Sequence, residues 1–169
     1  MRAQGQAAQI CIEDGGQMTF QLLYSSEASV ELDEAAIDEL IETSRQRNVS
    51  KGISGLLIYV NRCFLQLLEG EESKVRELFD KIRNDARHSE TFIYNEQRAS
   101  QKAFGSWTTG YREPTVCTLG EEMPGPKQIA RDIQILVQNK PLWIRSAVMM
   151  FGNAHTEIGH LYQLANRNG

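Results

Sequence analysis

Gln66 is the residue whose surroundings in the sequence point most clearly to chemistry. It lies in the apolar run CFLQLL, residues 63–68, which is typical of a buried β-strand. Alternate side chains of a strand share one face, so Gln66 is expected beside Phe64 and Leu68 in the core. A buried amide costs free energy unless its two donors and its acceptor find partners. The sequence therefore predicts that a neighbouring side chain or a bound ligand satisfies Gln66.

The elements around Gln66 alternate between strand and helix patterns. Strands are predicted over residues 18–24, 53–60, 63–68, 91–94 and about 107–111. One helix is expected from an Asp33 cap to about Asn48, and a second around the apolar positions 75, 78, 79 and 82, ending near Asp85. The turn Asn61-Arg62 is short enough for a β-hairpin. This order is typical of an α+β, ferredoxin-like sheet with both helices on one face.

Tyr24 is the first candidate partner for Gln66. It ends the more apolar face of the first predicted strand. In a ferredoxin-like sheet we expect the first and third strands to be neighbours and to run parallel. Both side chains belong to the face that meets the helices, so the phenol and the amide are expected within reach of each other.

Polar side chains gather where the two predicted helices end. Asn48 closes the first helix, and Asp85, Arg87 and His88 close the second. A planar ligand with a polar edge suits such a place, with Leu40 and Ile82 against its two faces. Asn48 and Arg87 would hydrogen-bond its edge. The alternative is structural: Asn48 caps its helix, and the other three residues form a solvated charge cluster.

The chain is expected to divide into three parts. Residues 1–17 are predicted as a weakly ordered leader, residues 18–112 as the sheet domain, and residues 113–169 as a C-terminal helical extension. The extension holds one helix from Pro126 and another over 141–151, with a polar tail after it. The second helix is so apolar that it should pack on the other face of the sheet or on a second subunit.

Composition excludes several classes of protein. The 169 residues are 41% apolar, carry a net charge of −4 and contain three widely spaced cysteines. Neither a nucleic-acid partner nor a membrane is expected, because both need a basic field or a long apolar span. No zinc spacing, phosphate loop or catalytic triad is evident, so no metal is expected. A cytoplasmic protein is predicted.

Four short motifs follow one another along the predicted sheet domain. They are GISGLLIY at 52–59, FLQLLEG at 64–70, DARH at 85–88 and FGSW at 104–107. Tyr24 and Asn48 stand at matching separations before them. Together these features resemble the BLUF family of blue-light sensors that use flavin adenine dinucleotide, over about residues 18–112.

The resemblance implies a flavin, FAD or else FMN, between the two helices. Its ring would contact Gln66, and the cofactor-binding set would comprise Leu40, Asn48, Gln66, Ile82, Asp85, Arg87 and His88. Light would draw an electron and a proton from Tyr24, and Gln66 would rearrange its hydrogen bonds without net reaction. Trp107 on the last strand would take part in passing the change on. Thr109 departs from the family, which usually has methionine there, so the output route of this chain stays open.

These features predict a blue-light photoreceptor that is not an enzyme. The 113–169 extension has no room for a catalytic domain, so the expected output is interaction within a homo-oligomer or with a separate protein. Two other hypotheses are a ferredoxin-like interaction module without photochemistry and a small acylphosphatase-like enzyme. The latter requires an anion-binding arginine near the first strand, and the loop at 25–27 has none.

Overall fold

The structure is a computed structural model that describes residues 18–30, 32–105, 107–112 and 126–167. Its elements are β1 (Thr19–Ala28), α1 (Glu34–Ser50), β2 (Ser54–Val60), β3 (Cys63–Gly70), α2 (Glu72–Arg83), β4 (His88–Ala99), β5 (Trp107–Arg112), α3 (Pro126–Val137) and α4 (Leu142–Arg167). The predicted order, including the fifth strand, is confirmed. The predicted leader, residues 1–17, lies outside the described residues.

The strands form one five-stranded sheet in the order β4-β1-β3-β2-β5. β1 and β3 are neighbours, as predicted, but they run antiparallel, and the expectation of a parallel pair was wrong. The reason lies in the connections. The β2–β3 hairpin reverses the chain, whereas helix α1 carries it from β1 to a parallel β2, so β3 between them opposes both. The parallel neighbours in this sheet are β2 and β5.

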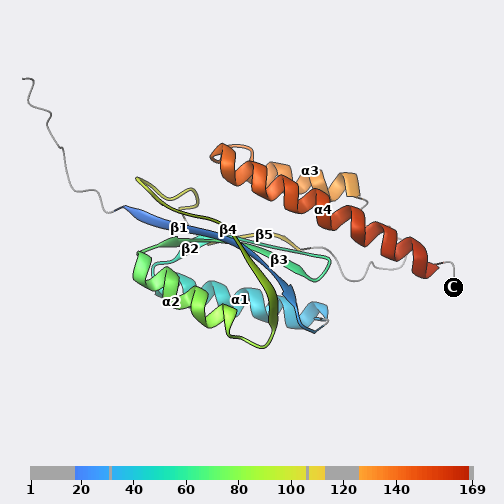
Figure 1. Cartoon of the computed structure of the whole chain (residues 1–169), viewed down its shortest axis with the longest axis horizontal. Helices are drawn as coiled ribbons and strands as arrows, with labels where there is room; N and C mark the ends of the chain where they lie inside the picture. Colours follow the sequence, from blue (N-terminus) through green and yellow to red (C-terminus); the bar gives the residue numbers. More distant parts are fainter. Residues whose placement is uncertain (1–17, 31, 106, 113–125, 168–169) are drawn as a thin grey trace, which may run out of the picture.

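Helices cover both faces of the sheet (Figure 1). α1 and α2 lie on one face, over a core that includes Tyr24, Phe64 and Phe79. α3 and α4 lie on the other, over a second core with Leu65, Val148 and other apolar side chains of the sheet and helices. The ferredoxin-like fold and the packing of the apolar C-terminal helix on the sheet are both confirmed. In the described residues, no helix is long and apolar enough to cross a membrane.

Local signals account for several element boundaries. Asp33 caps α1, as predicted, by accepting a hydrogen bond from the Ala36 amide at 2.8 Å. Asn61 and Arg62 both have positive φ, at 48° and 62°, which is the geometry of a tight hairpin turn. At Gly55 an added Cβ atom would lie 1.8 Å from the Leu67 carbonyl oxygen, so only glycine fits there.

Two predicted boundaries were wrong. The fourth strand is much longer than residues 91–94 and begins at His88, because it pairs with β1 along almost its whole length. Residues 152–167, expected as a tail without regular structure, continue α4. The first half of α4 is anchored by Ile144, Val148 and Phe151, and extending an existing helix adds one hydrogen bond for each residue fixed.

Candidate functional site

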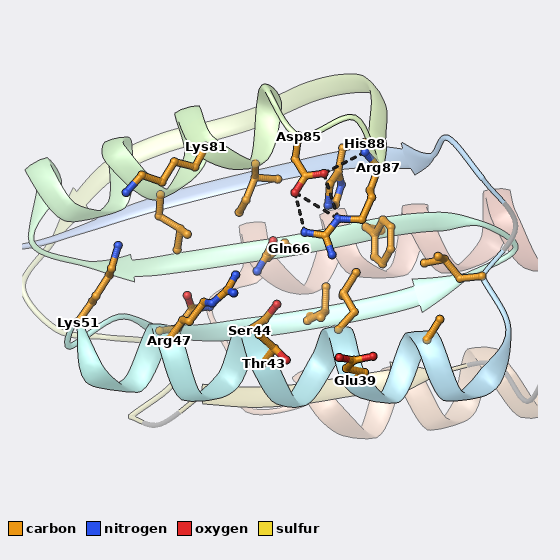
Figure 2. Close-up of a pocket in the computed structure, with 18 residues that line it drawn as sticks. Glu39, Thr43, Ser44, Arg47, Lys51, Gln66, Lys81, Asp85, Arg87 and His88 are labelled. Atoms are coloured by element: carbon orange, nitrogen blue, oxygen red, sulfur yellow. Dashed lines mark hydrogen bonds and ion pairs between the residues drawn. The ribbon is translucent and has the colours of Figure 1, made fainter.

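A cavity of about 650 Å³ lies between α1 and α2, above the centre of the sheet (Figure 2). Its volume is within the range of sites for cofactors and drug-sized ligands. All seven residues predicted as a binding set line it, namely Leu40, Asn48, Gln66, Ile82, Asp85, Arg87 and His88. The residues of the predicted set therefore border one contiguous cavity.

Tyr24 and Gln66 meet at the floor of this cavity. They stand directly opposite each other in the register of β1 and β3, and the Tyr24 hydroxyl donates a short hydrogen bond to the Gln66 side-chain oxygen. The exposed fraction is 0% for Tyr24 and 5% for Gln66. Burial raises the pKa of Tyr24, so the phenol keeps its proton and acts as the donor. Gln66 points into the cavity (Figure 2).

The walls beside Gln66 are apolar. Leu40 comes from α1 and Ile82 from α2, and both pack against the core beneath the cavity. Leu57 on β2 and Phe64 on β3 complete the floor around the amide. This arrangement suits a flat, apolar ring whose hydrogen-bonding edge faces the sheet.

One end of the cavity combines a buried amide with exposed cations. Asn48 is 2% exposed and lines the cavity, while its backbone oxygen accepts from the Ile53 amide at 2.9 Å. Helix α1 continues to Ser50 and its C-cap is Lys51, so Asn48 is not the capping residue that the structural alternative made it.

Arg47, Lys51 and Lys81 line the same end and were missed from the sequence. Lys51 and Lys81 both contact the Glu77 carboxylate, at 3.7 and 2.5 Å, so one acidic residue links the two helices at this end (Figure 2 shows the two lysines). The available signal was adjacency, because Arg47 precedes Asn48 and Lys81 precedes Ile82. Exposed lysines and arginines are common on helices, which is why adjacency alone does not single them out.

The other end holds the DARH residues. Arg87 forms a two-pronged ion pair with Asp85, with an Nη2–Oδ2 distance of 2.6 Å. The Arg87 guanidinium lowers the pKa of Asp85 to about 2. His88 lies at the start of β4 rather than at the helix end, where its Nδ1 is 2.8 Å from the Ser26 hydroxyl. Burial lowers the pKa of His88, which favours the neutral imidazole.

The register places Thr109 in the same row as the switch candidates. Tyr24 pairs with Gln66, Gln66 with Leu57, and Leu57 with Thr109. One strand, β2, therefore separates the Thr109 backbone from that of Gln66. Trp107, which lies two residues before Thr109 on β5, pairs with Gly55 of β2. For Trp107 and Thr109 the structure describes the backbone and not the side chain.

The chemistry of these residues fits a flavin. An isoalloxazine ring is flat, apolar on both faces and lined by donors and acceptors along one edge, and the cavity offers apolar walls and the amides of Asn48 and Gln66. The amide of Gln66 has its oxygen paired with Tyr24, and it borders the space that the ring would fill. The cations Arg47, Lys51 and Lys81 suit the phosphate groups of a flavin nucleotide.

Comparisons with known proteins agree with this site. The family model described as "Sensors of blue-light using FAD", BLUF, matches residues 19–110. The photoactivated adenylate cyclase subunit beta of Euglena longa is 32% identical over 88 residues, which are 52% of this chain and 10% of that protein. The blue light- and temperature-regulated antirepressor BluF of Escherichia coli is 31% identical over 71 residues, 42% of this chain and 18% of that protein.

A solved structure, the photo-activated state of BlsA, is 32% identical with a TM-score of 0.50 and covers 56% of this chain and 69% of that one. The chain thus spans only about a tenth to a fifth of the length of the two curated relatives. The match to the family model covers more than half of the chain, from the start of β1 into β5. The chain belongs to the BLUF family, the sensors of blue light using FAD.

Proposed function

We propose that the cavity holds the flavin ring between Leu40 and Ile82, with Asn48 and Gln66 along its polar edge. The support is geometric, because the apolar side chains come from the two facing helices and the amides from the cavity's end and floor. The single observation that carries the proposal is the hydrogen bond from Tyr24 to Gln66. The side chains of both residues are buried, with exposed fractions of 0% for Tyr24 and 5% for Gln66. Tyr24 pairs with the oxygen of the Gln66 amide, and the NH2 group of the same amide can donate to a ligand in the cavity.

The residues of the chain then act as a switch. The bound flavin supplies blue-light absorption and an excited state that accepts an electron. Tyr24 would give up an electron and, through the Gln66 amide, a proton, and it would recover both before the red-shifted state is left, so no net oxidation occurs. Gln66 is left with a changed amide arrangement that exchanges its hydrogen bonds with Tyr24 and the ring. Trp107 takes part in passing on the change.

Asp85, Arg87 and His88 support the other end of the site. The ion pair keeps Asp85 ionised and fixes the Arg87 guanidinium next to the cavity. His88 is held by Ser26 and packs on Phe64, with 5.0 Å between the ring centroids, so it stays neutral beside the floor. We propose that Arg87 and His88 contact the cofactor, and that Asp85 positions Arg87.

The output is proposed to be an interaction between proteins. Residues 18–112 form the flavin domain, and the 113–169 extension carries the signal to a homo-oligomer, to a separate partner in the cytoplasm, or to both. α3 and α4 pack on the sheet face opposite the cavity, which gives the extension a direct contact with β3. No enzyme activity is proposed for residues 126–167, which form the two helices α3 and α4.

Spectroscopy tests the proposal. Protein purified or reconstituted with FAD or FMN should be yellow, and blue light should shift its absorption reversibly to the red. Gln66→Leu should still bind flavin but lose the shift, while Gln97→Leu, on the other face of the sheet, should keep it. A protein that binds neither flavin, or a Gln66→Leu variant with an unchanged red shift, would contradict the proposal.

Size-exclusion chromatography in the dark and under blue light tests the output. A change in elution volume on illumination is expected if self-association carries the signal. An unchanged oligomer in both states would refute light-controlled self-assembly and leave the separate partner as the target. Because the photochemistry is measured independently, failure of this experiment does not affect the assignment of the switch.

A further inference from the structure

A row of polar side chains, part-buried on β4 and buried on the inner strands, crosses the sheet on the face away from the cavity. The register sets Gln97, Gln21, Glu69 and Ser54 side by side on β4, β1, β3 and β2. The Gln97 amide donates to the Gln21 oxygen at 2.8 Å, and the Gln21 amide donates to a Glu69 oxygen at 2.6 Å. Such a row in a core that is otherwise apolar costs free energy unless its groups are satisfied, so its place calls for a reason.

Glu69 is the centre of this row, and it binds a loop. Its carboxylate is 0% exposed and accepts hydrogen bonds from the backbone amides of Ala103 at 2.7 Å and Phe104 at 2.8 Å. Together with Gln21, these donors are all neutral N–H groups. The loop between β4 and β5 is therefore fastened to β3 just before Trp107 and the last strand.

Lys140 fastens the same loop to the C-terminal helices. It lies in the turn between α3 and α4, where its backbone amide donates to the Val137 carbonyl at 2.9 Å. Its ammonium donates to the Ala103 carbonyl at 2.8 Å and lies 4.4 Å from the centroid of the Phe104 ring. Ala103 thus has its amide on Glu69 and its carbonyl on Lys140. In Figure 1 the loop and the α3–α4 turn lie at the same end of the molecule.

The alternation of β3 connects this network to the switch. Gln66 faces the cavity, and Glu69, three residues further on, faces α3 and α4. Gln66 and Glu69 belong to the same strand, which is paired on both sides, with β1 and with β2. A shift of the β3 backbone at Gln66 would therefore reach Glu69, and the loop bound to Glu69 would pass it to Lys140.

We propose that Glu69 is a positioning residue that couples the Gln66 strand to the α3–α4 turn through the Ala103–Phe104 loop and Lys140. The inference rests on the proposed function for the light-driven change, but the anchoring of the loop does not. It also gives this chain an output route that does not depend on which residue occupies position 109. The route runs from β3 to the helices over the face opposite the flavin.

Hydrogen exchange tests the anchoring in the dark. In Glu69→Gln the new amide group keeps one acceptor oxygen and loses the other, so exchange of the Ala103 and Phe104 amides should quicken by about tenfold. Lys140→Met should leave those two amides protected, because it removes only the hydrogen bond to the Ala103 carbonyl and leaves the hydrogen bonds of the amides to Glu69 in place. Unchanged protection of both amides in Glu69→Gln would overturn the assignment.

Hydrogen exchange in dark and light tests the coupling. In the wild-type protein, illumination should alter exchange in the α3–α4 turn, and this response should be lost in Lys140→Met and in Glu69→Gln. Both variants should keep the flavin red shift. Lys102→Met is the matched control, since Lys102 donates from the same loop to the Gly52 carbonyl at 3.0 Å and not to the α3–α4 turn.

The outcomes separate the two proposals. The coupling would be refuted if Glu69→Gln and Lys140→Met kept both the red shift and the light-dependent change of exchange in the α3–α4 turn. It would also be refuted if Lys102→Met lost that change to the same extent. Either result would leave the photochemistry standing. A wild-type protein that shifts its spectrum but shows no response at the turn would refute the coupling as well. A wild-type protein with no red shift would instead refute the proposed switch, and the dark exchange of Ala103 and Phe104 would then decide the anchoring alone.

Discussion

Replacing Tyr24 by Phe removes one hydroxyl group from a side chain that is 0% exposed. The ring still fits, because Tyr24 packs edge-on against Phe79 with 4.9 Å between the centroids. What changes is the Gln66 oxygen, which loses its donor at 5% exposure. An orphaned buried acceptor costs about 2 kcal/mol of unfolding free energy. In a chain of this size that corresponds to a melting temperature lower by about 4–8 °C.

A double-mutant cycle with Gln66→Leu isolates this bond. The single Gln66→Leu change orphans the Tyr24 hydroxyl and should also cost about 2 kcal/mol. The double variant leaves neither group without a partner, so it should be less destabilised than the sum of the two, with a coupling energy of about 2 kcal/mol. Urea unfolding of the flavin-free protein measures it, because a bound ligand would add to the stability of the folded state.

Tyr94→Phe is the matched control for the same chemical change. Its hydroxyl receives a hydrogen bond from Ser25 at 3.3 Å, and its side chain is 44% exposed, so we expect an effect below about 0.5 kcal/mol. In the flavin-loaded protein Tyr24→Phe should abolish the red shift and Tyr94→Phe should not. Additive single effects in the cycle, together with a normal red shift in Tyr24→Phe, would refute the reasoning.

Three further outcomes follow from the structure. Gly55→Ala should destabilise the protein by more than about 3 kcal/mol in urea unfolding, since the new Cβ would lie 1.8 Å from the Leu67 carbonyl oxygen. Arg87 lowers the pKa of Asp85 from 3.8 to about 2. The ionised carboxylate therefore stabilises the fold above about pH 4, and this contribution is lost as the pH falls toward 2. Asp85→Asn should flatten that part of the plot of unfolding free energy against pH. Burial raises the pKa of Cys63 to about 11, so iodoacetamide at about pH 8 should label it about 100-fold more slowly in the folded protein than in urea.

Each outcome has its own control. Gly105→Ala adds a Cβ with no atom within 4 Å and should be nearly neutral, so equal losses at Gly55 and Gly105 would contradict the close-contact argument. Arg87→Met removes the partner of Asp85 and should flatten the same part of the profile, so an unchanged acid limb in Arg87→Met would contradict the ion pair as its cause. A Cys63 that reacts as fast in the folded as in the unfolded protein would show that its thiol is not desolvated.

The site could be predicted largely because its residues contradict their surroundings. Gln66 is polar within an apolar strand, and Tyr24 ends the matching face of another, so period-2 alternation was enough to set them on one side of a sheet. Leu40 and Ile82 were found through the helical period. Arg47, Lys51 and Lys81 obey the ordinary rule that cations occupy exposed helix surface, so nothing in the sequence distinguished them from solvated side chains.

The sequence by itself determined the elements, their faces and the family, because those depend on residue period, caps and short motifs that are local. Tertiary structure alone decided that Glu69 receives the Ala103 and Phe104 amides and that Lys140 reaches the same loop. Those contacts join residues more than 30 positions apart. The partners of a loop amide or of a lysine in a turn depend on how distant segments pack, and a local pattern carries no information about that packing. The direction of β3, in contrast, follows from the predicted hairpin and from the helix that joins β1 to β2.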